Sequence, residues 1–189
     1  MHYLHKILVY IPNVIENTGE IQEKSELMNE IRVYAEHETE EYYCDVFDWR
    51  ETQTAGRWES EYPENVLLAV DNIQDFTDEL REVKSYQDSS VDYALSRLKG
   101  TVGTDLEKIV KDIWDRDDDL FGLDSSDNWN VAMSSICLKD IAFMLSGIYT
   151  SDSMFYNTFE RTARLYPSDI RKVENNPENW ALVMFDYHD

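Results

Sequence analysis

Two dense runs of acidic residues contain the side chains whose types and spacing could do chemistry. The first run comprises Glu36, Glu38, Glu40, Glu41, Asp45 and Asp48. The second run comprises Asp115, Asp117, Asp118, Asp119, Asp124 and Asp127. Carboxylate oxygens bind hard divalent cations, and they also pair with lysine and arginine side chains of a protein partner. The runs therefore raise two hypotheses, a metal site and a partner-binding surface.

The second run fits only part of a calcium-binding loop. With Asp115 at the first position, Asp117 and Asp119 fall on ligand positions. Leu120, however, stands where the sharp turn of the loop needs glycine, and Ser126 stands where a bidentate glutamate belongs. Because the motif fails at two defining positions, the sequence predicts no specific calcium site, and weak cation binding stays open.

The first run overlaps a sequence that is superficially like a metalloprotease helix. His37 and Glu38 begin that motif, but Glu41 occupies the position that needs a second histidine. Nucleophilic catalysis also lacks a motif, because Cys44 and Cys137 lie in no catalytic signature and no Gly-x-Ser-x-Gly occurs. The sequence predicts no catalytic residue, metal ligand or cofactor. A metal-dependent or hydrolytic enzyme built on one acidic cluster is the alternative.

The first run lies at the predicted C-terminal end of a helix, where acidic side chains are unfavourable. The helix dipole opposes them, and carboxylates four residues apart repel each other by about a few tenths of a kcal/mol per contact. This placement favours a surface kept negative for a basic partner. An ordinary solvated face is the alternative.

Aromatic residues are interleaved with acidic ones directly after the first run. Trp49 and Trp58 are the predicted partner anchors, because aromatic side chains contribute much of the binding energy at interfaces and an acidic rim suits a basic protein. Packing of these aromatics into the core is the alternative. Base stacking on them would need a positively charged groove, which the sequence lacks, so we expect no direct nucleic-acid binding.

The net charge indicates which partners are compatible with the chain. The 189 residues contain 39 Asp and Glu against 17 Lys and Arg, a formal net charge of −22. Residues 1–128 hold 31 acidic and 12 basic residues, whereas residues 129–189 hold 8 and 5. This field repels nucleic acids and anionic membranes and attracts basic proteins. The N-terminal apolar run is too short for a signal peptide or a membrane span, so a cytoplasmic protein is expected.

The elements that must position these residues form, by prediction, a single α+β domain over residues 1–189. Aromatic residues make up 13% of the chain, which is too many for a disordered acidic protein. A small three-stranded or similar sheet is expected, with strands at 3–11, 66–70 and 180–187. About five helices pack against it, expected at 23–43, 72–100, 104–114, 131–146 and 153–165, with a further short helical turn at 168–173.

Three further features complete this expectation. Residues 45–62 are predicted to form a loop or hairpin, and residues 115–127 an acidic linker. The segment 131–146 is apolar on most faces, which is typical of a central, buried helix. His2, His5 and His188 could meet if the first and last strands pair.

Four segments in the first third of the chain carry a resemblance: AEHETEEYY at 35–43, FDWRET at 47–52, AGRW at 55–58 and YPENV at 62–66. The chain there resembles uncharacterised acidic proteins carried on mobile elements of gut Firmicutes. Acidic proteins from such elements include antirestriction and anti-CRISPR inhibitors, some of which imitate DNA. The resemblance itself implies no particular activity.

The leading hypothesis is a non-enzymatic inhibitor or adaptor that presents carboxylates to a basic, nucleic-acid-binding or defence protein. Carboxylates three or four residues apart on a helix stand roughly 5–6 Å apart, and DNA carries about one charge per 3.4 Å of each strand, so a helix face can approximate a row of phosphates. Both acidic runs, with Trp49 and Trp58, are the predicted partner-binding residues. A third possibility is an interaction domain with a plain solvated acidic surface.

Overall fold

The chain divides into two compact units, one formed by Met1–Ser85 with Gly147–Asp189 and the other by Tyr86–Ser146. The computed structural model describes residues 1–19, 21–46, 49–102, 110–111, 126–150 and 153–188. Each unit is described by itself below. The expectation of a single folding domain stays a prediction.

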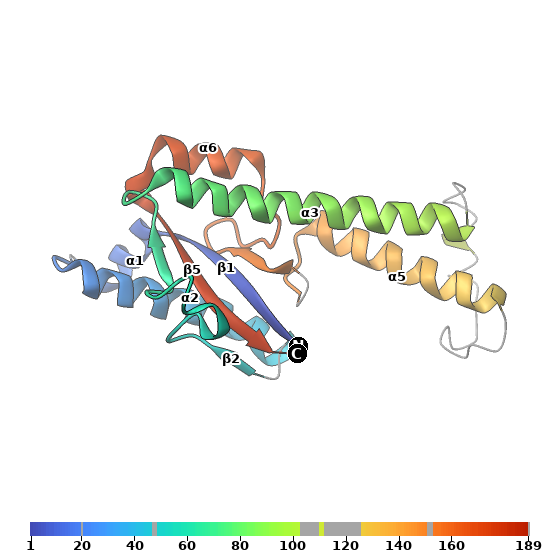
Figure 1. The fold of residues 1–189 in the computed structure, drawn as a ribbon, viewed down its shortest axis with the longest axis horizontal. Helices are drawn as coiled ribbons and strands as arrows, with labels where there is room; N and C mark the ends of the chain where they lie inside the picture. Colours follow the sequence, from blue (N-terminus) through green and yellow to red (C-terminus); the bar gives the residue numbers. More distant parts are fainter. Residues whose placement is uncertain (20, 47–48, 103–109, 112–125, 151–152, 189) are drawn as a thin grey trace. The chain divides into compact units, whose positions relative to one another are not determined.

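A mixed five-stranded sheet forms the centre of the first unit (Figure 1). Its strands are β1 (His2–Tyr10), β2 (Trp49–Glu51), β3 (Val66–Leu68), β4 (Phe155–Asn157) and β5 (Trp180–His188). Strand β5 pairs antiparallel with β1, β2 and β3, and β1 pairs in parallel with β4. The α+β class is therefore confirmed, with five strands rather than three.

Five α-helices lie within the described residues, together with two 3-10 turns. The helices are α1 (Ile11–Thr18), α2 (Lys24–Val46), α3 (Ile73–Val102), α5 (Ser126–Ser146) and α6 (Pro167–Asn175), and the turns are Gly56–Trp58 and Pro177–Asn179. None of the helices in the described part of the chain is long and apolar enough to cross a membrane.

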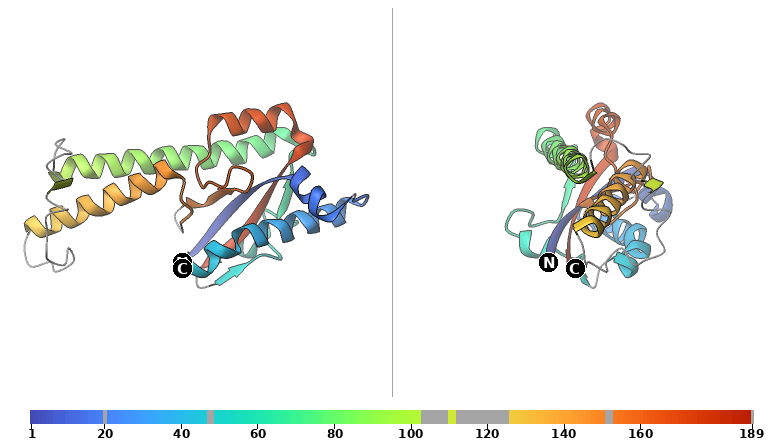
Figure 2. Two further views of the ribbon diagram at one scale, coloured as in Figure 1. Left: turned by 180° about the vertical axis from the view of Figure 1, so that it is seen from behind. Right: turned by 90° about the vertical axis from the view of Figure 1, so that its right-hand side faces the viewer.

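Helices cover both faces of the sheet, which explains why β1 and β5 are nearly continuous apolar runs (Figure 2). Helices α1 and α2 pack on one face, where Ile7 and Val183 lie in the core. The first three turns of α3 and helix α6 pack on the other, where Leu8 and Leu182 are fully buried. At the start of α3 the Asn72 side chain accepts a hydrogen bond from the Asp75 amide at 3.3 Å and so caps the helix.

Several predicted elements are confirmed with small shifts in their ends. The three expected strands correspond to β1, β3 and β5, and the expected helices at 23–43, 72–100 and 168–173 correspond to α2, α3 and α6. Helix α3 continues through Gly100, which was expected to end it. The expected helix at 104–109 and 112–114 and the acidic linker at 115–125 lie outside the described residues.

The helix expected at 153–165 is wrong. Phe155–Asn157 forms strand β4, because its backbone pairs with β1: the Lys6 amide donates to the Met154 carbonyl at 3.0 Å, and the Thr158 amide donates to the Leu8 carbonyl at 3.0 Å. The Asn157 side chain then accepts hydrogen bonds from two following amides, which forms a turn instead of a helix.

Three smaller differences from the expected elements are also present. Helix α1 begins directly after β1 with Pro12 in its first turn, where the missing amide hydrogen of proline costs nothing. The segment 45–62, expected as a loop or hairpin, begins with the last residues of α2 and contains β2 and a 3-10 turn. Helix α5 is not a central buried helix, because it belongs to the second unit and exposes 37% of Ile136 and 58% of Leu145. Cys137 of α5 packs against Leu98 of α3.

Several buried polar side chains form hydrogen bonds on the face of the sheet that α2 covers. His5 Nδ1 and the Tyr149 hydroxyl are hydrogen-bonded at 2.6 Å, and the Tyr187 hydroxyl donates to Thr39 Oγ1 at 3.4 Å. Burial raises the pKa of Tyr149 well above its ordinary value, and the neighbouring Tyr187 raises it further.

This shift predicts a loss of stability at alkaline pH. Above pH 10 an unfolded tyrosine releases its proton while the folded Tyr149 keeps it, so the free energy of unfolding should fall by up to about 1.4 kcal/mol per pH unit for this residue. Below pH 10 the contribution is fully present. Urea unfolding between pH 7 and pH 11 should show a shallower alkaline slope for Tyr149→Phe and an unchanged one for Tyr93→Phe, whose side chain is exposed. Equal slopes for wild type and Tyr149→Phe would contradict this assignment.

Candidate functional site

Part of the first acidic run is neutralised within the protein by Arg50 of β2. Its guanidinium, only 5% exposed, contacts the carboxylate of Glu40 and lies 3.8 Å from that of Glu36. Arg50 also donates to Thr39 Oγ1 at 3.1 Å. The two glutamates therefore hold β2 against α2, and they do not form a free row of charges.

The other predicted carboxylates are described to different extents. Glu38 lies on α2, 3.8 Å from His37 Nδ1, with a side chain 19% exposed. The backbones of Glu41 and Asp45 lie in α2, and that of Asp127 lies in α5. The residues outside the described part of the chain are Asp48, Asp115, Asp117, Asp118, Asp119 and Asp124.

The two tryptophans predicted as anchors have different surroundings. Trp49 on β2 is 45% exposed, and its ring lies 6.1 Å from that of His2. Trp58 packs against the buried cluster on the α3 face of the sheet. Trp49 is therefore open to a partner, whereas Trp58 is partly buried against the core.

Two of the three terminal histidines meet, as the pairing of the first and last strands requires. The rings of His2 and His188 lie 4.9 Å apart, and His2 Nδ1 is hydrogen-bonded to Asp186 at 2.9 Å. His5 instead bonds Tyr149 inside the core. Within the described ranges, no group of three or more His, Cys, Asp or Glu is placed to hold a metal ion.

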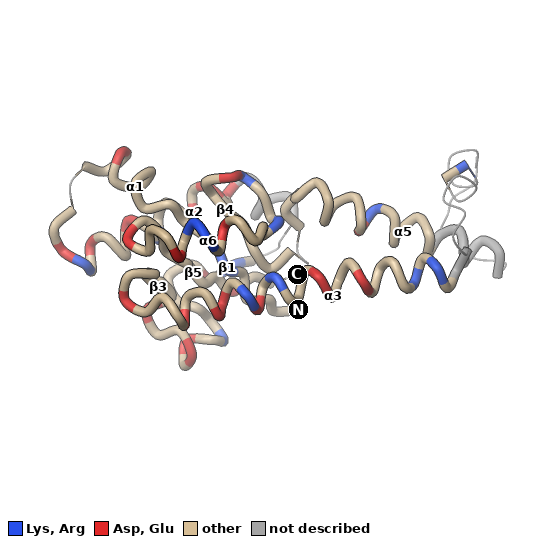
Figure 3. The backbone as a smooth tube through the Cα atoms, turned by 90° about the horizontal axis from the view of Figure 1, so that it is seen from above, with Lys and Arg blue, Asp and Glu red and all other residues tan. Residues whose placement is uncertain are grey.

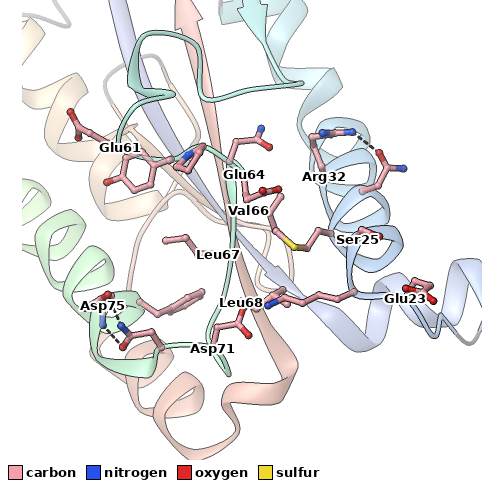
Figure 4. Close-up of a pocket in the computed structure, with 18 residues that line it drawn as sticks. Glu23, Ser25, Arg32, Glu61, Glu64, Val66, Leu67, Leu68, Asp71 and Asp75 are labelled. Atoms are coloured by element: carbon pink, nitrogen blue, oxygen red, sulfur yellow. Dashed lines mark hydrogen bonds and ion pairs between the residues drawn. The ribbon is translucent and has the colours of Figure 1, made fainter.

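A groove of about 850 Å³ lies along β3, between the first turns of α2 and the start of α3 (Figure 4). Its apolar lining includes Met28, Val66, Leu68 and Phe76. Its charged lining comprises Glu23, Glu61, Glu64, Asp71 and Asp75, against Lys24 and Arg32. The groove therefore combines an apolar floor with a net negative rim.

The carboxylates of this rim differ in how they are paired. Lys24 donates to Asp71 at 2.7 Å, and Asn72 donates to Asp75 at 2.5 Å. Glu23, Glu61 and Glu64 make no ion pair with any residue that the structure describes. These three carboxylates are available to an incoming cation.

Buried polar atoms among the groove residues are also unpaired. Within the described part of the chain, Arg32 Nε and Asn65 Oδ1 are buried and have no hydrogen-bond partner. The remaining guanidinium nitrogens of Arg32 donate to Asn29 and to the Gln53 carbonyl. One donor and one acceptor at the groove are thus unsatisfied, which is unusual for buried side chains.

At the side of the groove, the Tyr62 hydroxyl donates to the carboxylate of Glu79 at 2.9 Å. Burial, followed by this hydrogen bond, raises the pKa of Tyr62. The tyrosine therefore stays a neutral hydrogen-bond donor over the physiological range, and it supplies no base for catalysis.

This groove was not among the sites predicted from the sequence. Its acidic residues come from three segments, and along the sequence they are sparser than the two runs that drew the prediction. In Figure 3, Asp and Glu alternate with Lys and Arg along α3 instead of forming one dense run. A signal was available: the predicted strand at 66–70 has acidic residues on both sides, Glu61 and Glu64 before it and Asp71 and Asp75 after it.

No protein-family model, curated protein or solved structure matches the chain.

Proposed function

We propose that this chain is a non-enzymatic interaction protein that binds a basic protein partner through the groove along β3. The observation that carries this proposal is the set of three carboxylates on the rim, Glu23, Glu61 and Glu64, which have no ion-pair partner among the described residues. Lysine or arginine side chains of a partner would pair with them, and the net charge of −22 would accelerate the encounter. A cytoplasmic location is part of this proposal.

The finer hypothesis is a DNA-mimic inhibitor of a nucleic-acid-binding or defence protein. The groove supports binding of a basic surface, but Glu36 and Glu40 on α2 are engaged by Arg50, which weakens the phosphate-row argument for that helix. A mimic should release its partner when duplex DNA or salt is added. A partner captured from lysate and retained in the presence of both would contradict the mimicry.

The proposed function is tested with a labelled octalysine peptide and two variants of equal charge. Glu23→Gln/Glu61→Gln/Glu64→Gln removes the unpaired rim carboxylates, and Glu16→Gln/Glu59→Gln/Glu178→Gln removes three exposed carboxylates that do not line the groove. Fluorescence anisotropy at low salt should show binding about tenfold weaker for the groove variant, since three surface pairs contribute about 0.5 kcal/mol each. The control variant should bind nearly as wild type. Equal weakening in both variants would overturn the assignment to the groove.

A further inference from the structure

The outer edge of β3 has main-chain groups that no strand pairs. On the inner edge, the Asn65 carbonyl accepts from the Met184 amide at 2.9 Å, and the Ala69 amide donates to the Trp180 carbonyl at 3.0 Å. Because main-chain groups alternate in an antiparallel pair, those of Val66 and Leu68 point away from β5. The Leu68 carbonyl accepts from the Asp71 amide at 3.1 Å.

Two donors and one acceptor are left at this edge. The Val66 amide, the Val66 carbonyl and the Leu68 amide have no hydrogen-bond partner among the described residues. Val66 and Leu68 expose only 3% and 6% of their surfaces, and both residues line the groove. Unpaired main-chain groups with so little access to water are costly, and a strand laid along them would satisfy all three.

We propose that the groove binds an extended segment of the basic partner as an added strand on the outer edge of β3. This inference rests on the proposed function and specifies the conformation of the bound segment. A residue opposite Val66 would exchange two main-chain hydrogen bonds with it, and the next paired residue would accept from the Leu68 amide. The residue opposite Val66 therefore cannot be proline, because it must donate its amide hydrogen to the Val66 carbonyl.

The side chains of the groove specify the chemistry of the segment. Successive side chains of an added strand point alternately to its two faces. Glu23 lies on the α2 side of β3, and Glu61 and Asp75 lie on the α3 side, so cationic side chains find carboxylates on both sides (Figure 4). Met28 and Phe76 provide apolar contact between them. The occupant is an extended segment rich in Lys or Arg with apolar or threonine residues between.

Within the groove, the ammonium group of Lys24 already pairs with the carboxylate of Asp71. The side chains are 59% and 48% exposed, so the pair adds little to stability. Lys24 already occupies one carboxylate that a partner cation could use. Its removal should therefore strengthen binding of a basic segment.

The test uses the peptide Lys-Thr-Lys-Val-Lys-Thr-Lys, blocked at both ends, and two isomers of it with N-methyl groups on alternate amides. The full-length chain should bind the unmethylated peptide and one of the isomers, and the isomer methylated on the amides that face β3 should bind at least tenfold more weakly. Hydrogen exchange at the Val66 and Leu68 amides should slow at least tenfold on binding. Exchange at Leu67, whose residue pairs with Leu182 of β5, should change little.

Two substitutions complete the test. Lys24→Gln should tighten binding a few-fold, and Lys139→Gln, which makes the same charge change at an exposed residue that does not line the groove, should have a much smaller effect. If all three peptides bind equally and the Val66 and Leu68 amides gain no protection, the added strand is overturned while the charge-based function stands. If no peptide binds and the triple groove variant equals wild type with octalysine, the proposed function itself fails.

Discussion

Replacing Gly56 with alanine is expected to lower the free energy of unfolding by about 3 kcal/mol, through backbone strain combined with overpacking. Gly56 has a φ of +55°, which L-residues adopt at a cost. A Cβ atom there would lie 2.3 Å from Asp186 Oδ2 and 2.5 Å from Asp186 Cβ. Asp186 is 1% exposed and is held by His2 and by the Arg57 amide, so it cannot move away without losing these bonds.

Urea unfolding monitored by circular dichroism measures this loss. Gly100→Ala is the matched control, because Gly100 lies inside α3 with no atom within 4 Å of the added Cβ. That substitution should stabilise the chain by about 0.5–1 kcal/mol, the usual difference between glycine and alanine in a helix. A Gly56→Ala variant as stable as wild type would show that Asp186 is not fixed where the structure places it.

Replacing Lys6 with methionine should lower the free energy of unfolding by about 2 kcal/mol, below the range for fully buried pairs because one partner is exposed. Lys6 lies on the α3 face of β1 with a side chain 8% exposed, and its ammonium group is 2.6 Å from Glu79 Oε2 and from Glu82 Oε2. Methionine fills the same space without the charge. Glu79, 21% exposed, then keeps a partly buried negative charge, to which the Tyr62 hydroxyl still donates.

A double-mutant cycle separates the charge from the packing. Lys6→Met/Glu79→Gln should lose less than Lys6→Met alone, because the second substitution removes the uncompensated charge. Lys24→Gln, which breaks an exposed ion pair, should cost less than about 1 kcal/mol. If the double variant lost as much free energy of unfolding as Lys6→Met alone, or more, uncompensated charge would not explain the effect of Lys6→Met.

The sheet was predictable where the sequence signal is local. Strands β1 and β5 are long apolar runs bounded by turn residues, and α2 and α3 carry apolar residues at helical spacing. Strands β2 and β4 have three residues each and exist because β5 and β1 pair with them. Strand β3 is as short, but it lies within the five-residue apolar run at 66–70. Strands β2 and β4 lie in no such run, so residues 153–165 resembled a helix.

The pairing of the acidic residues could likewise not be predicted from local sequence. Counting carboxylates along the chain located the first acidic run, but it could not show that Arg50, which follows the run, turns back from β2 to pair with Glu36 and Glu40. The groove along β3 brings together residues from α2, β3 and α3. Its unpaired atoms, such as Arg32 Nε, are visible only when every possible partner is placed.

The position of β5 in the sheet also dictates the order in which the first unit can fold. Strand β5 is the last strand along the chain, yet it joins β1, β2 and β3, and His2 bonds Asp186 across 184 positions of sequence. A nascent chain that ends before Trp180 lacks the strand that links these three to one another. Closing the long loop between β1 and β5 is slow relative to forming helices. We therefore expect α2 and α3 to form before the strands of the sheet pair. During synthesis the apolar run of β1 stays without its main partner until the ribosome has made Trp180–His188.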